Sequence, residues 1–439
     1  DLGTENNLKY YGNECNVMAE ILLSRYDVYI AKRIQTHITT NLSASEIETQ
    51  YGNRVRSRMR ELFNLIAYDN NSKDKSKESL KKYKKDFQKD LVLIFNENNL
   101  GFGEGNNCGI NIAKGKYVAL LNNDCIVDKN WLKEMVNTAN NYPKSFAINS
   151  KILLYPAIYK YELESNNLNL SLTKSNLLKT VGKTEIPIKT YCLDSKYYAE
   201  IPFDKFNDQV IEISDGQKTK KISISKNINF YHKIQNAGIT VFQNGYGRDN
   251  GALIKDSLQD YEIDKNQYKK TKEVYAACGG AVLYKKELLK KIGGFDKNFF
   301  LYYEDVDISE RARLLNYSII FSPNAIAYHY HSLSAKEWSP LFIFHSEKGR
   351  LLHTFFNFPI RVFIKEYIRF IYTSILRFLL NCNSRENRIK NIQYIKVVKY
   401  FILNIPKLTL RRISRNKNLP QKAINNNFRK IFEGYWYFN

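Results

Sequence analysis

Residues 91–124 read LVLIFNENNLGFGEGNNCGINIAKGKYVALLNND, and this stretch decides the fold class. Two short apolar runs, at 91–95 and 117–121, flank a glycine-rich segment at 99–105, which is expected to form a loop, and a helical pattern at 106–114. Apolar runs that alternate with helices at this spacing predict strands of a parallel sheet joined by crossover helices. The sequence therefore predicts an α/β fold.

The same alternation continues on both sides of this stretch. It begins with an apolar run at 63–68 and a Lys-rich helical pattern at 74–88. Further along the chain, the patterns predict helices at 285–292 and 306–315 and strands at 318–321 and 325–328. Gly293 and Gly294 are expected to stop the first of these two helices, because glycine readily adopts the left-handed conformation of a helix end.

Changes in composition divide the chain into three segments. Residues 1–60 show no recognisable chemistry, with helical patterns at 16–23 and 44–62 and a strand pattern at 27–34. Residues 61–345 hold the alternating pattern, which a β-rich insertion interrupts at about 148–230. Residues 346–439 form a basic tail in which apolar and basic residues alternate at helical spacing, for example at 361–380. Such amphipathic helices suit either a membrane interface or packing onto the rest of the protein.

The net charge of +23 is concentrated in this basic tail. Between Lys348 and Asn439 there are nineteen Lys and Arg residues and only three acidic residues. This pattern predicts a surface for phosphates, such as anionic lipid head groups, nucleic acid or lipid-linked diphosphates. Solvated basic helices with no partner are the alternative.

The location of the protein follows from its cysteines and its hydropathy. None of the six cysteines forms a C-x-x-C pair, which argues against a disulfide framework or a zinc site and indicates a reducing cytoplasm. No run of 18 apolar residues is present that would span a bilayer. We expect a cytoplasmic protein that is peripheral at the inner face of the plasma membrane. The first residue is Asp, which indicates a fragment or a processed product.

One of the apolar runs leads directly into a carboxylate, in the order Leu-Leu-Asn-Asn-Asp at 120–124. A buried strand that delivers an Asp to the carboxyl edge of a sheet can hold a hard cation against a diphosphate. A strand-ending Asp also serves as a helix cap, but Asp128 is better placed to cap the helix expected near Trp131. The pattern therefore favours Asp124 as a metal ligand.

Three acids, Glu304, Asp305 and Asp307, stand within four positions beside an aromatic stretch. Like charges that lie this close raise one another's pKa, and partial burial raises it further, which suits a general base. The alternative is an acidic first turn that stabilises the helix containing Arg311. The cluster as a whole favours the catalytic interpretation.

Two further segments suggest ligand binding. His329 and His331 end an expected strand on the same face, which favours metal or diphosphate binding, with His329 as the preferred candidate. The segment 99–109 is rich in glycine and opens a helix, so its amides suit a phosphate, although a tight turn without a ligand is the alternative. Its glycine spacing is not that of a dinucleotide-binding fingerprint.

Together these motifs resemble the family 2 glycosyltransferases, in particular a rhamnosyltransferase-like branch that builds bacterial surface polysaccharides. The resemblance runs from about residue 64 to 345. Its first half is carried by DNNSKD at 69–74, NLGFGEGNNCG at 99–109 and LLNND at 120–124. Its second half is carried by GGA at 279–281, GGFD at 293–296, YEDVD at 303–307 with Arg311, and PNAIAYH at 323–329.

The resemblance implies a GT-A fold, which is a Rossmann-like mixed sheet flanked by helices. It also implies a divalent cation, Mn²⁺ or Mg²⁺, and an inverting displacement in which a nucleotide-sugar donor (dTDP-rhamnose-like or a UDP-sugar) gives its sugar to a hydroxyl of a growing, lipid-linked cell-surface glycan. An anionic membrane surface would be a further partner, and nucleic acid would not.

Carried over by position, the resemblance assigns a role to each candidate residue. Asp305 would be the catalytic base with Glu304 beside it, while Asp307 would lie inside the following helix. Asp124 and His329 would hold the metal. In the donor site, Asp69 would contact the nucleotide base and Asp74 would support the loop that holds Asp69. Gly279 and Gly280 would lie beside the donor sugar. The donor pocket would be lined by Asn99, Gly101, Asn107 and Asn122.

Two departures from the family pattern leave alternatives open. The first apolar strand of the family, which ends in a nucleotide-holding turn, has no clear counterpart in residues 1–60. The chain is therefore also compatible with a catalytically impaired homologue that binds sugar nucleotides. The central motif is Asn-Asn-Asp rather than Asp-x-Asp, a variation that this branch tolerates. A basic nucleic-acid-binding protein is the other alternative, although no RNA-binding signature is present.

Overall fold

The computed structural model describes residues 8–10, 13–15, 65–87, 91–155, 157–163, 178–181, 184–187, 189–193, 196–203, 210–214, 219–223, 230–255, 258–330, 338–380, 384–417, 424–425 and 428. The helices expected at 16–23 and 44–62, the strand expected at 27–34 and the candidate ligand His331 lie outside the described residues. The chain divides into two compact units, one formed by residues 1–100 and 105–116 and the other by residues 101–104 and 117–439.

The first unit contains a β-α-β arrangement, as predicted from the alternating pattern. Strand β3 (Leu65–Asp69) pairs in parallel with β4 (Leu91–Phe95), and helix α3 (Ser76–Phe87) connects them. A separate antiparallel pair joins β1 (Leu8–Tyr10) and β2 (Asn13–Cys15). The parallel register brings the carboxyl ends of β3 and β4 together, since Asp69 is the partner of Phe95.

Helix α4 (Gly101–Ile112) begins earlier than the sequence predicts, because the glycines expected to form a loop are helical. Close packing explains this difference. A Cβ atom on Gly101 would lie 2.2 Å from the Phe300 carbonyl oxygen, and one on Gly103 would lie 2.9 Å from the Phe295 Cβ. Gly101 also has a φ of 77°, which favours glycine. The glycines therefore permit a close approach that outweighs their poor helix propensity.

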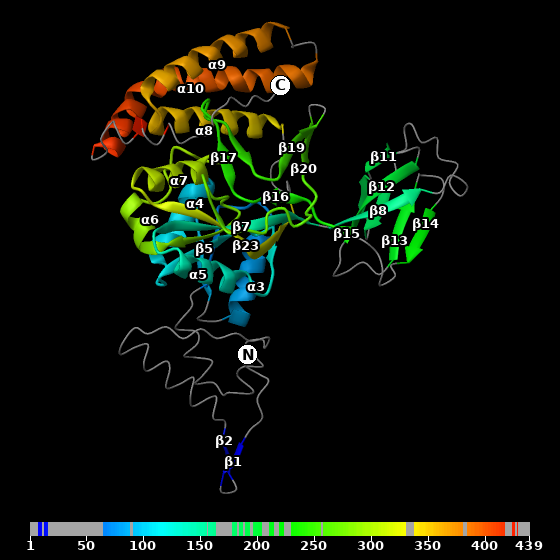
Figure 1. Cartoon of the computed structure of the whole chain (residues 1–439). Helices are drawn as coiled ribbons and strands as arrows, with labels where there is room; N and C mark the ends of the chain where they lie inside the picture. Colours follow the sequence, from blue (N-terminus) through cyan, green and yellow to red (C-terminus); the bar gives the residue numbers. More distant parts are fainter. Residues whose placement is uncertain are drawn as a thin grey trace. The chain divides into compact units, whose positions relative to one another are not determined.

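The second unit is built on a seven-stranded mixed sheet (Figure 1). Its main path runs β21-β23-β7-β22-β5, with β16 paired to β7 and β6 paired to β23. Only β7 and β23 are parallel, and the other pairs are antiparallel. The strands are β5 (Tyr117–Leu121), β6 (Cys125–Val127), β7 (Ser145–Leu154), β16 (Ile234–Asn236), β21 (Lys272–Val274), β22 (Ala281–Lys285) and β23 (Ser318–His329).

Three helices belong to this sheet: α5 (Trp131–Asn141), α6 (Lys286–Ile292) and α7 (Glu304–Leu314). Helix α5 buries Trp131 and Met135 against Ile148 of β7 and Ala327 of β23. Helix α6 ends at Gly293, whose φ of 89° confirms the predicted glycine stop. The mixed sheet with flanking helices confirms the predicted α/β class, but β5, which was expected in a parallel sheet, pairs antiparallel with β22.

Two boundaries in this unit differ from the prediction. The β-rich insertion was expected from residue 148, but 148–154 belong to strand β7, which is buried except at Leu154. The segment includes Asn149, Ser150 and Lys151, and these polar residues are buried like the apolar residues around them. The strands expected at 318–321 and 325–328 form the single strand β23, whose register shifts between Ser322 and Ile326. Pro323 lies within that shift and donates no N–H to the ladder.

The chain after β7 is rich in strands, as predicted. One four-stranded sheet has the order β10-β9-β13-β14 and another has the order β11-β12-β8-β15. Their strands are β8 (Ala157–Leu163), β9 (Leu178–Val181), β10 (Thr184–Pro187), β11 (Lys189–Leu193), β12 (Lys196–Phe203), β13 (Val210–Ser214), β14 (Thr219–Ser223) and β15 (Phe230–Tyr231). Two hairpins follow, formed by β17 (Ile239–Val241) with β18 (Gly247–Asp249) and by β19 (Ala252–Lys255) with β20 (Leu258–Tyr261).

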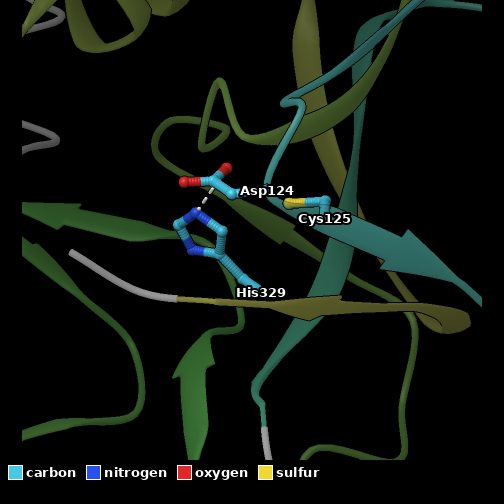
Figure 2. Close-up of side chains that lie close together, drawn as sticks. All are labelled: Asp124, Cys125 and His329. Carbon is cyan, nitrogen blue, oxygen red and sulfur yellow. Dashed lines mark hydrogen bonds and ion pairs between the residues drawn. The ribbon is translucent and has the colours of Figure 1, made fainter. Parts of the chain in front are cut away.

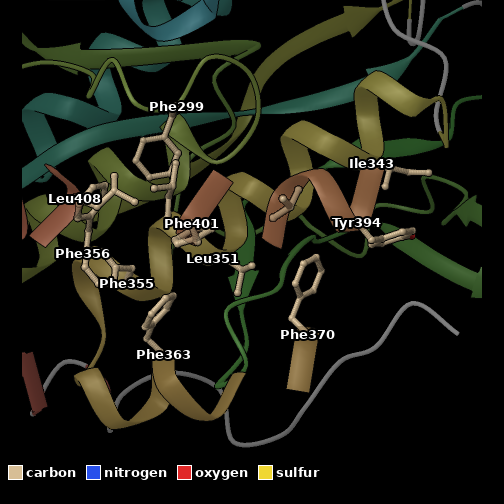
Figure 3. Packing of buried hydrophobic residues seen from close by; sticks show 12 residues of the cluster. Phe299, Ile343, Leu351, Phe355, Phe356, Phe363, Phe370, Tyr394, Phe401 and Leu408 are labelled. Atoms are coloured by element: carbon tan, nitrogen blue, oxygen red, sulfur yellow. The ribbon is translucent and has the colours of Figure 1, made fainter. Parts of the chain in front are cut away.

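The basic tail forms helices α8 (Pro340–Asn357), α9 (Ile360–Leu380) and α10 (Arg385–Asn416). They share one hydrophobic cluster, shown in Figure 3, in which Phe356 of α8, Phe363 of α9 and Phe401 of α10 gather with Phe299 from the segment before α7. These helices belong to the second compact unit. None of the described helices combines the length and the apolar character that crossing a membrane requires. The three-segment division predicted from composition stays a prediction.

Candidate functional site

The candidate metal ligands Asp124 and His329 face each other at the end of the mixed sheet (Figure 2). The Nε2 atom of His329 lies 3.0 Å from Asp124 Oδ1. The backbone fixes this approach, because Tyr330 N–H donates to the carbonyl oxygen of Asp124 at 2.9 Å. Two residues that are far apart in sequence are thus brought together by the pairing of β6 with β23.

Gln235 on β16 faces the other ring nitrogen of this histidine. Its Oε1 lies 2.7 Å from His329 Nδ1, and an amide oxygen only accepts, so Nδ1 carries the proton. In the neutral ring, Nε2 then presents a lone pair to the Asp124 carboxylate, which is itself an acceptor. Two acceptors at 3.0 Å require a cation or a second proton between them. The donor set of a carboxylate and an oriented imidazole therefore fits a divalent metal ion.

Cys125 is a third candidate donor at this place that the sequence did not single out. One ligand atom each from Asp124, Cys125 and His329 lies within 4.8 Å of the others. The thiol also donates to the carbonyl oxygen of Gly280 at 3.7 Å. Burial, and then the negative charge of Asp124, raise the pKa of Cys125 to about 12.

Asp305 lies in the first turn of α7 with its carboxylate fixed by two backbone groups. Gly279 N–H donates to Oδ2 at 3.0 Å, and Val306 N–H donates to Oδ1 at 2.8 Å. Burial raises the pKa of the Asp305 carboxyl, while these N–H groups act in the opposite direction. A held carboxylate with a raised pKa has the character of a general base.

Glu304 differs from Asp305 in its surroundings. It is buried, and its Oε2 has no hydrogen-bond partner among the described residues. Burial, and then the negative charge of Asp305, hold the pKa of Glu304 well above its usual range. Glu304 is therefore expected to stay protonated when Asp305 is ionised, since two buried carboxylates this close do not both ionise readily.

Asp307 lies inside α7, as the family motif implies, and it is fully paired. It accepts from Arg311 of the same helix, from Asn357 of α8 and from Arg415 of α10. Burial alone would raise the pKa of Asp307, but Arg415 and Arg311 outweigh it and hold that pKa well below the usual range. This residue therefore stabilises the helix and does not have the character of a base.

The backbone before α7 is held in a rare conformation. Tyr302 and Tyr303 both adopt left-handed φ angles, 65° and 69°. Gly349 of α8 permits this, since a Cβ there would lie 2.8 Å from the Tyr302 carbonyl oxygen. Tyr303 Oη accepts from Gly247 N–H at 3.1 Å. Consecutive non-glycine residues in this region cost free energy, and such strain is found mainly at functional sites.

Gly279 and Gly280 connect the metal ligands to the acids. Gly279 supplies an N–H to Asp305, and Gly280 O accepts from Asn122 N–H at 2.9 Å. A Cβ on Gly279 would lie 3.0 Å from the Phe102 ring, which explains the glycine there. The structure thus brings Asn122, Asp124, Gly279, Gly280, Glu304, Asp305 and His329 into one compact unit, together with Gly101.

The other predicted donor residues lie in the first unit, mainly in roles that shape its loops. Asp69 is buried, and its Oδ1 accepts from Ser72 N–H at 3.1 Å. Asp74 Oδ1 accepts from Ser76 N–H at the start of α3, and the hydrogen bonds from Ser76 lower the pKa of Asp74. Asn99 is exposed and Asn107 of α4 is half-buried.

Three polar residues in the site were not predicted from the sequence. Cys125 follows Asp124 directly and was the easiest of them to detect. Gln235 comes from β16 and Lys348 from α8, and neither lies in a recognisable motif. Burial lowers the pKa of Lys348 to about 8, while Glu304 acts in the opposite direction.

Part of the chain is similar to known proteins. Residues 52–196 match the family model described as Glycosyl transferase family 2. A poly(ribitol-phosphate) beta-glucosyltransferase of Bacillus spizizenii is 24% identical over 180 residues, which is 41% of this chain and 28% of that protein. An uncharacterized glycosyltransferase of Methanocaldococcus jannaschii is 45% identical over 64 residues, 14% of this chain and 21% of that protein. The matches thus span less than a third of either curated relative.

Solved structures with similarity to the chain include GalNAc-T7 with UDP, GalNAc and Mn²⁺, with a TM-score of 0.40 at 14% identity, covering 82% of this chain and 53% of that one. Residues 1–349 of TarS from S. aureus with UDP give 0.34 at 14% identity, covering 84% and 83%. The family match includes β3, β4 and β5, and both curated relatives are named as glycosyltransferases. Residues 52–196 are therefore similar to the glycosyltransferases of family 2.

Proposed function

We propose that this protein is an inverting glycosyltransferase that moves a sugar from a UDP- or dTDP-linked donor to a hydroxyl of a growing, lipid-linked glycan. The observation that carries the proposal is that Gly279 and Gly280 connect the candidate base Asp305 to the loop that holds Asp124. On one side Gly279 N–H holds the Asp305 carboxylate, and on the other Gly280 O fixes the loop that presents Asp124. A base and a metal site linked in this way suit transfer to a hydroxyl with departure of a diphosphate.

In this proposal Asp124 and His329 hold the divalent cation, and Gln235 orients the imidazole. The cation, when bound, supplies charge neutralisation for the departing diphosphate. Asp305 takes the proton from the acceptor hydroxyl as the new bond forms. Glu304, protonated, keeps a second negative charge away from Asp305. Resemblance to the rhamnosyltransferase-like branch supports a rhamnosyl donor. The named activity of the Bacillus spizizenii relative supports a glucosyl donor and a polyol-phosphate acceptor instead.

A membrane surface is the second partner that we propose. Helix α9 buries Phe363, Glu366, Phe370 and Ser374 on one face. Its opposite face exposes Ile364, Ile368, Tyr372, Ile375 and Leu379, flanked by the exposed Arg361, Lys365 and Arg369. Apolar residues bordered by basic ones suit the interface of an anionic membrane, where a lipid-linked acceptor would be located.

A donor screen by mass spectrometry tests the proposal. Purified protein with Mn²⁺ is incubated with UDP- and dTDP-sugars and either a lipid-diphosphate glycan or a poly(ribitol-phosphate) acceptor. We expect a mass increase of one sugar residue from one donor, and loss of that product in Asp305→Asn. Tight binding of a nucleotide without any transfer would instead identify an impaired homologue, and binding of single-stranded RNA in preference to nucleotides would contradict the proposal.

A further inference from the structure

Cys125 lies at the proposed metal site but has no part in the proposed function. It is the first residue of β6, and its Cα partner in the antiparallel pairing with β23 is His329. Side chains of directly opposite residues in an antiparallel pair lie on the same face, with their Cβ atoms about 4.5–5.5 Å apart. The sheet register itself therefore places the thiol beside the imidazole.

Asp124 reaches the same place from the turn that precedes β6. Asn122 O accepts from Cys125 N–H at 3.1 Å, so residues 122–125 form a tight turn, and Asn122 N–H is bound to Gly280 O at 2.9 Å. This turn fixes two consecutive side chains, a carboxylate and a thiol. One ligand atom of each lies within 4.8 Å of the other and of a ring nitrogen of His329 (Figure 2).

We propose that Cys125 is a third metal ligand, so that the site offers one oxygen, one nitrogen and one sulfur atom. A carboxylate alone suits Mg²⁺, whereas imidazole and thiolate favour ions such as Co²⁺ and Zn²⁺. The inference rests on the metal site of the proposed function and makes it selective for thiophilic ions over Mg²⁺. The residual positions around the ion stay available to donor oxygens and water.

Binding of the metal ion by Cys125 releases one proton. Only the thiolate binds a metal, so the bond between sulfur and the ion forms as the S–H bond breaks and the proton passes to solvent. The hydrogen bond from the thiol to Gly280 O is lost at the same time. Nothing is oxidised or reduced, and no other reactant is required.

Cobalt spectroscopy tests the inference without any measurement of sugar transfer. The full chain is titrated with Co²⁺ in the presence and absence of UDP, and the absorption spectrum is recorded. A thiolate bound to Co²⁺ gives a near-ultraviolet charge-transfer band that oxygen and nitrogen ligands do not give. We expect this band in the unmodified protein, its loss in Cys125→Ser, and its loss on addition of Zn²⁺ but not of Mg²⁺.

Cys108→Ser is the matched control, because Cys108 is another half-buried cysteine that forms no disulfide and it lies in the other compact unit. It should leave the band unchanged. The inference is overturned if Co²⁺ binds without a sulfur band, if the band persists in Cys125→Ser, or if no Co²⁺ binds under either condition. A Cys125-dependent band in a protein that transfers no sugar would keep this inference and reject the proposed function.

Discussion

At the scale of single residues, Asp305 and Glu304 are neighbours with opposite expected protonation. Both have raised pKa values because they are buried, but only Asp305 receives two backbone N–H groups that favour its ionised form. Glu304 has an Oε2 without a partner in the described part of the chain, and the backbone group that favours its ionised form is its own N–H. The fold therefore separates two adjacent carboxyl groups into a base and a neutral acid.

The first prediction follows from this separation. Asp305→Asn removes the proton acceptor and should lower turnover by about 10²–10⁴-fold while nucleotide affinity hardly changes. Glu304→Gln replaces a neutral acid by a neutral amide and should be much milder. Turnover measured beside nucleotide affinity checks this, with Asp307→Asn as a structural comparison. If Glu304→Gln were inactive and Asp305→Asn active, the catalytic base would be Glu304 and not Asp305.

The pH profile gives a second prediction for the same residue. Asp305 must be ionised to act as a base, and its pKa is raised by burial. Activity should therefore fall as the pH drops through a value above the ordinary Asp pKa of about 3.9. The acidic limb of kcat/KM measures this, and Glu304→Gln should leave the limb in place. A limb at or below the ordinary value would contradict the raised pKa.

A third prediction concerns the orientation of His329. Gln235→Leu removes the acceptor for Nδ1–H and should weaken binding of Mn²⁺ by about 10–100-fold, the usual effect of losing such an outer partner. Gln235→Glu keeps an acceptor oxygen and should retain most of the affinity. Calorimetric titration with Mn²⁺ and UDP compares the variants. Equal affinities for Gln235→Leu and the unmodified protein would show that this hydrogen bond has no role in metal binding.

At the scale of elements, two arginines near the end of α10 form ion pairs with Asp296 and Asp307. Arg415 binds Asp307 and also Asp296, 3.0 Å away, and Arg411 binds Asp296 at 3.1 Å. Burial alone would raise the pKa of Asp296, but Arg415 and Arg411 contribute to a net lowering. Part of the charge of the basic tail is thus used inside the protein and is not available to a membrane.

A fourth prediction tests this connection between α10 and α7. Arg415→Met leaves two buried carboxylates with fewer partners and should lower the free energy of unfolding by about 3–5 kcal/mol. Arg388→Met, which removes an exposed arginine from the same helix, is the matched control and should have little effect. Urea denaturation of both variants measures the difference. An unchanged stability for Arg415→Met would show that Arg311 and Asn357 suffice for Asp307.

At the scale of the whole molecule, the basic tail packs into a shared hydrophobic cluster and also has an exposed face, which is the basis of the proposed membrane contact. One face of α9 belongs to the cluster that α8, α10 and Phe299 share, while the other exposes apolar and basic side chains. Removing the tail after residue 345 would expose this cluster, so truncation is a poor test of membrane binding. Surface substitutions test it without disturbing the buried face.

The fifth prediction uses such substitutions. Ile368 and Leu379 are 62% and 70% exposed, so changing both to Asn should reduce binding to anionic liposomes without destabilising the fold. Added salt should also weaken binding, because it screens the attraction of the basic residues. Leu132→Asn, an exposed leucine of α5, is the control. Liposome sedimentation measures the effect, and unchanged binding of the double variant would reject α9 as the membrane contact.

The sequence by itself determined the order of strands and helices around the site. The runs at 91–95 and 117–121 match β4 and β5, because short apolar segments bounded by turn residues have little choice of structure. The sequence also placed Asp124, Asp305 and His329 at element ends, since each is the polar residue that terminates or opens an apolar or helical pattern.

Only the tertiary structure decided which residues meet. Gly101 and Gly103 are helical because close packing against Phe300 and Phe295 outweighs local propensity, and residues 148–154 belong to a central strand because β22 and β23 pair with β7. Gln235, Cys125 and Lys348 join the site through sheet register and helix packing, which bring together atoms that no local pattern relates. Contacts of long sequence separation depend on the whole fold, whereas turns and periodicity depend only on neighbouring residues.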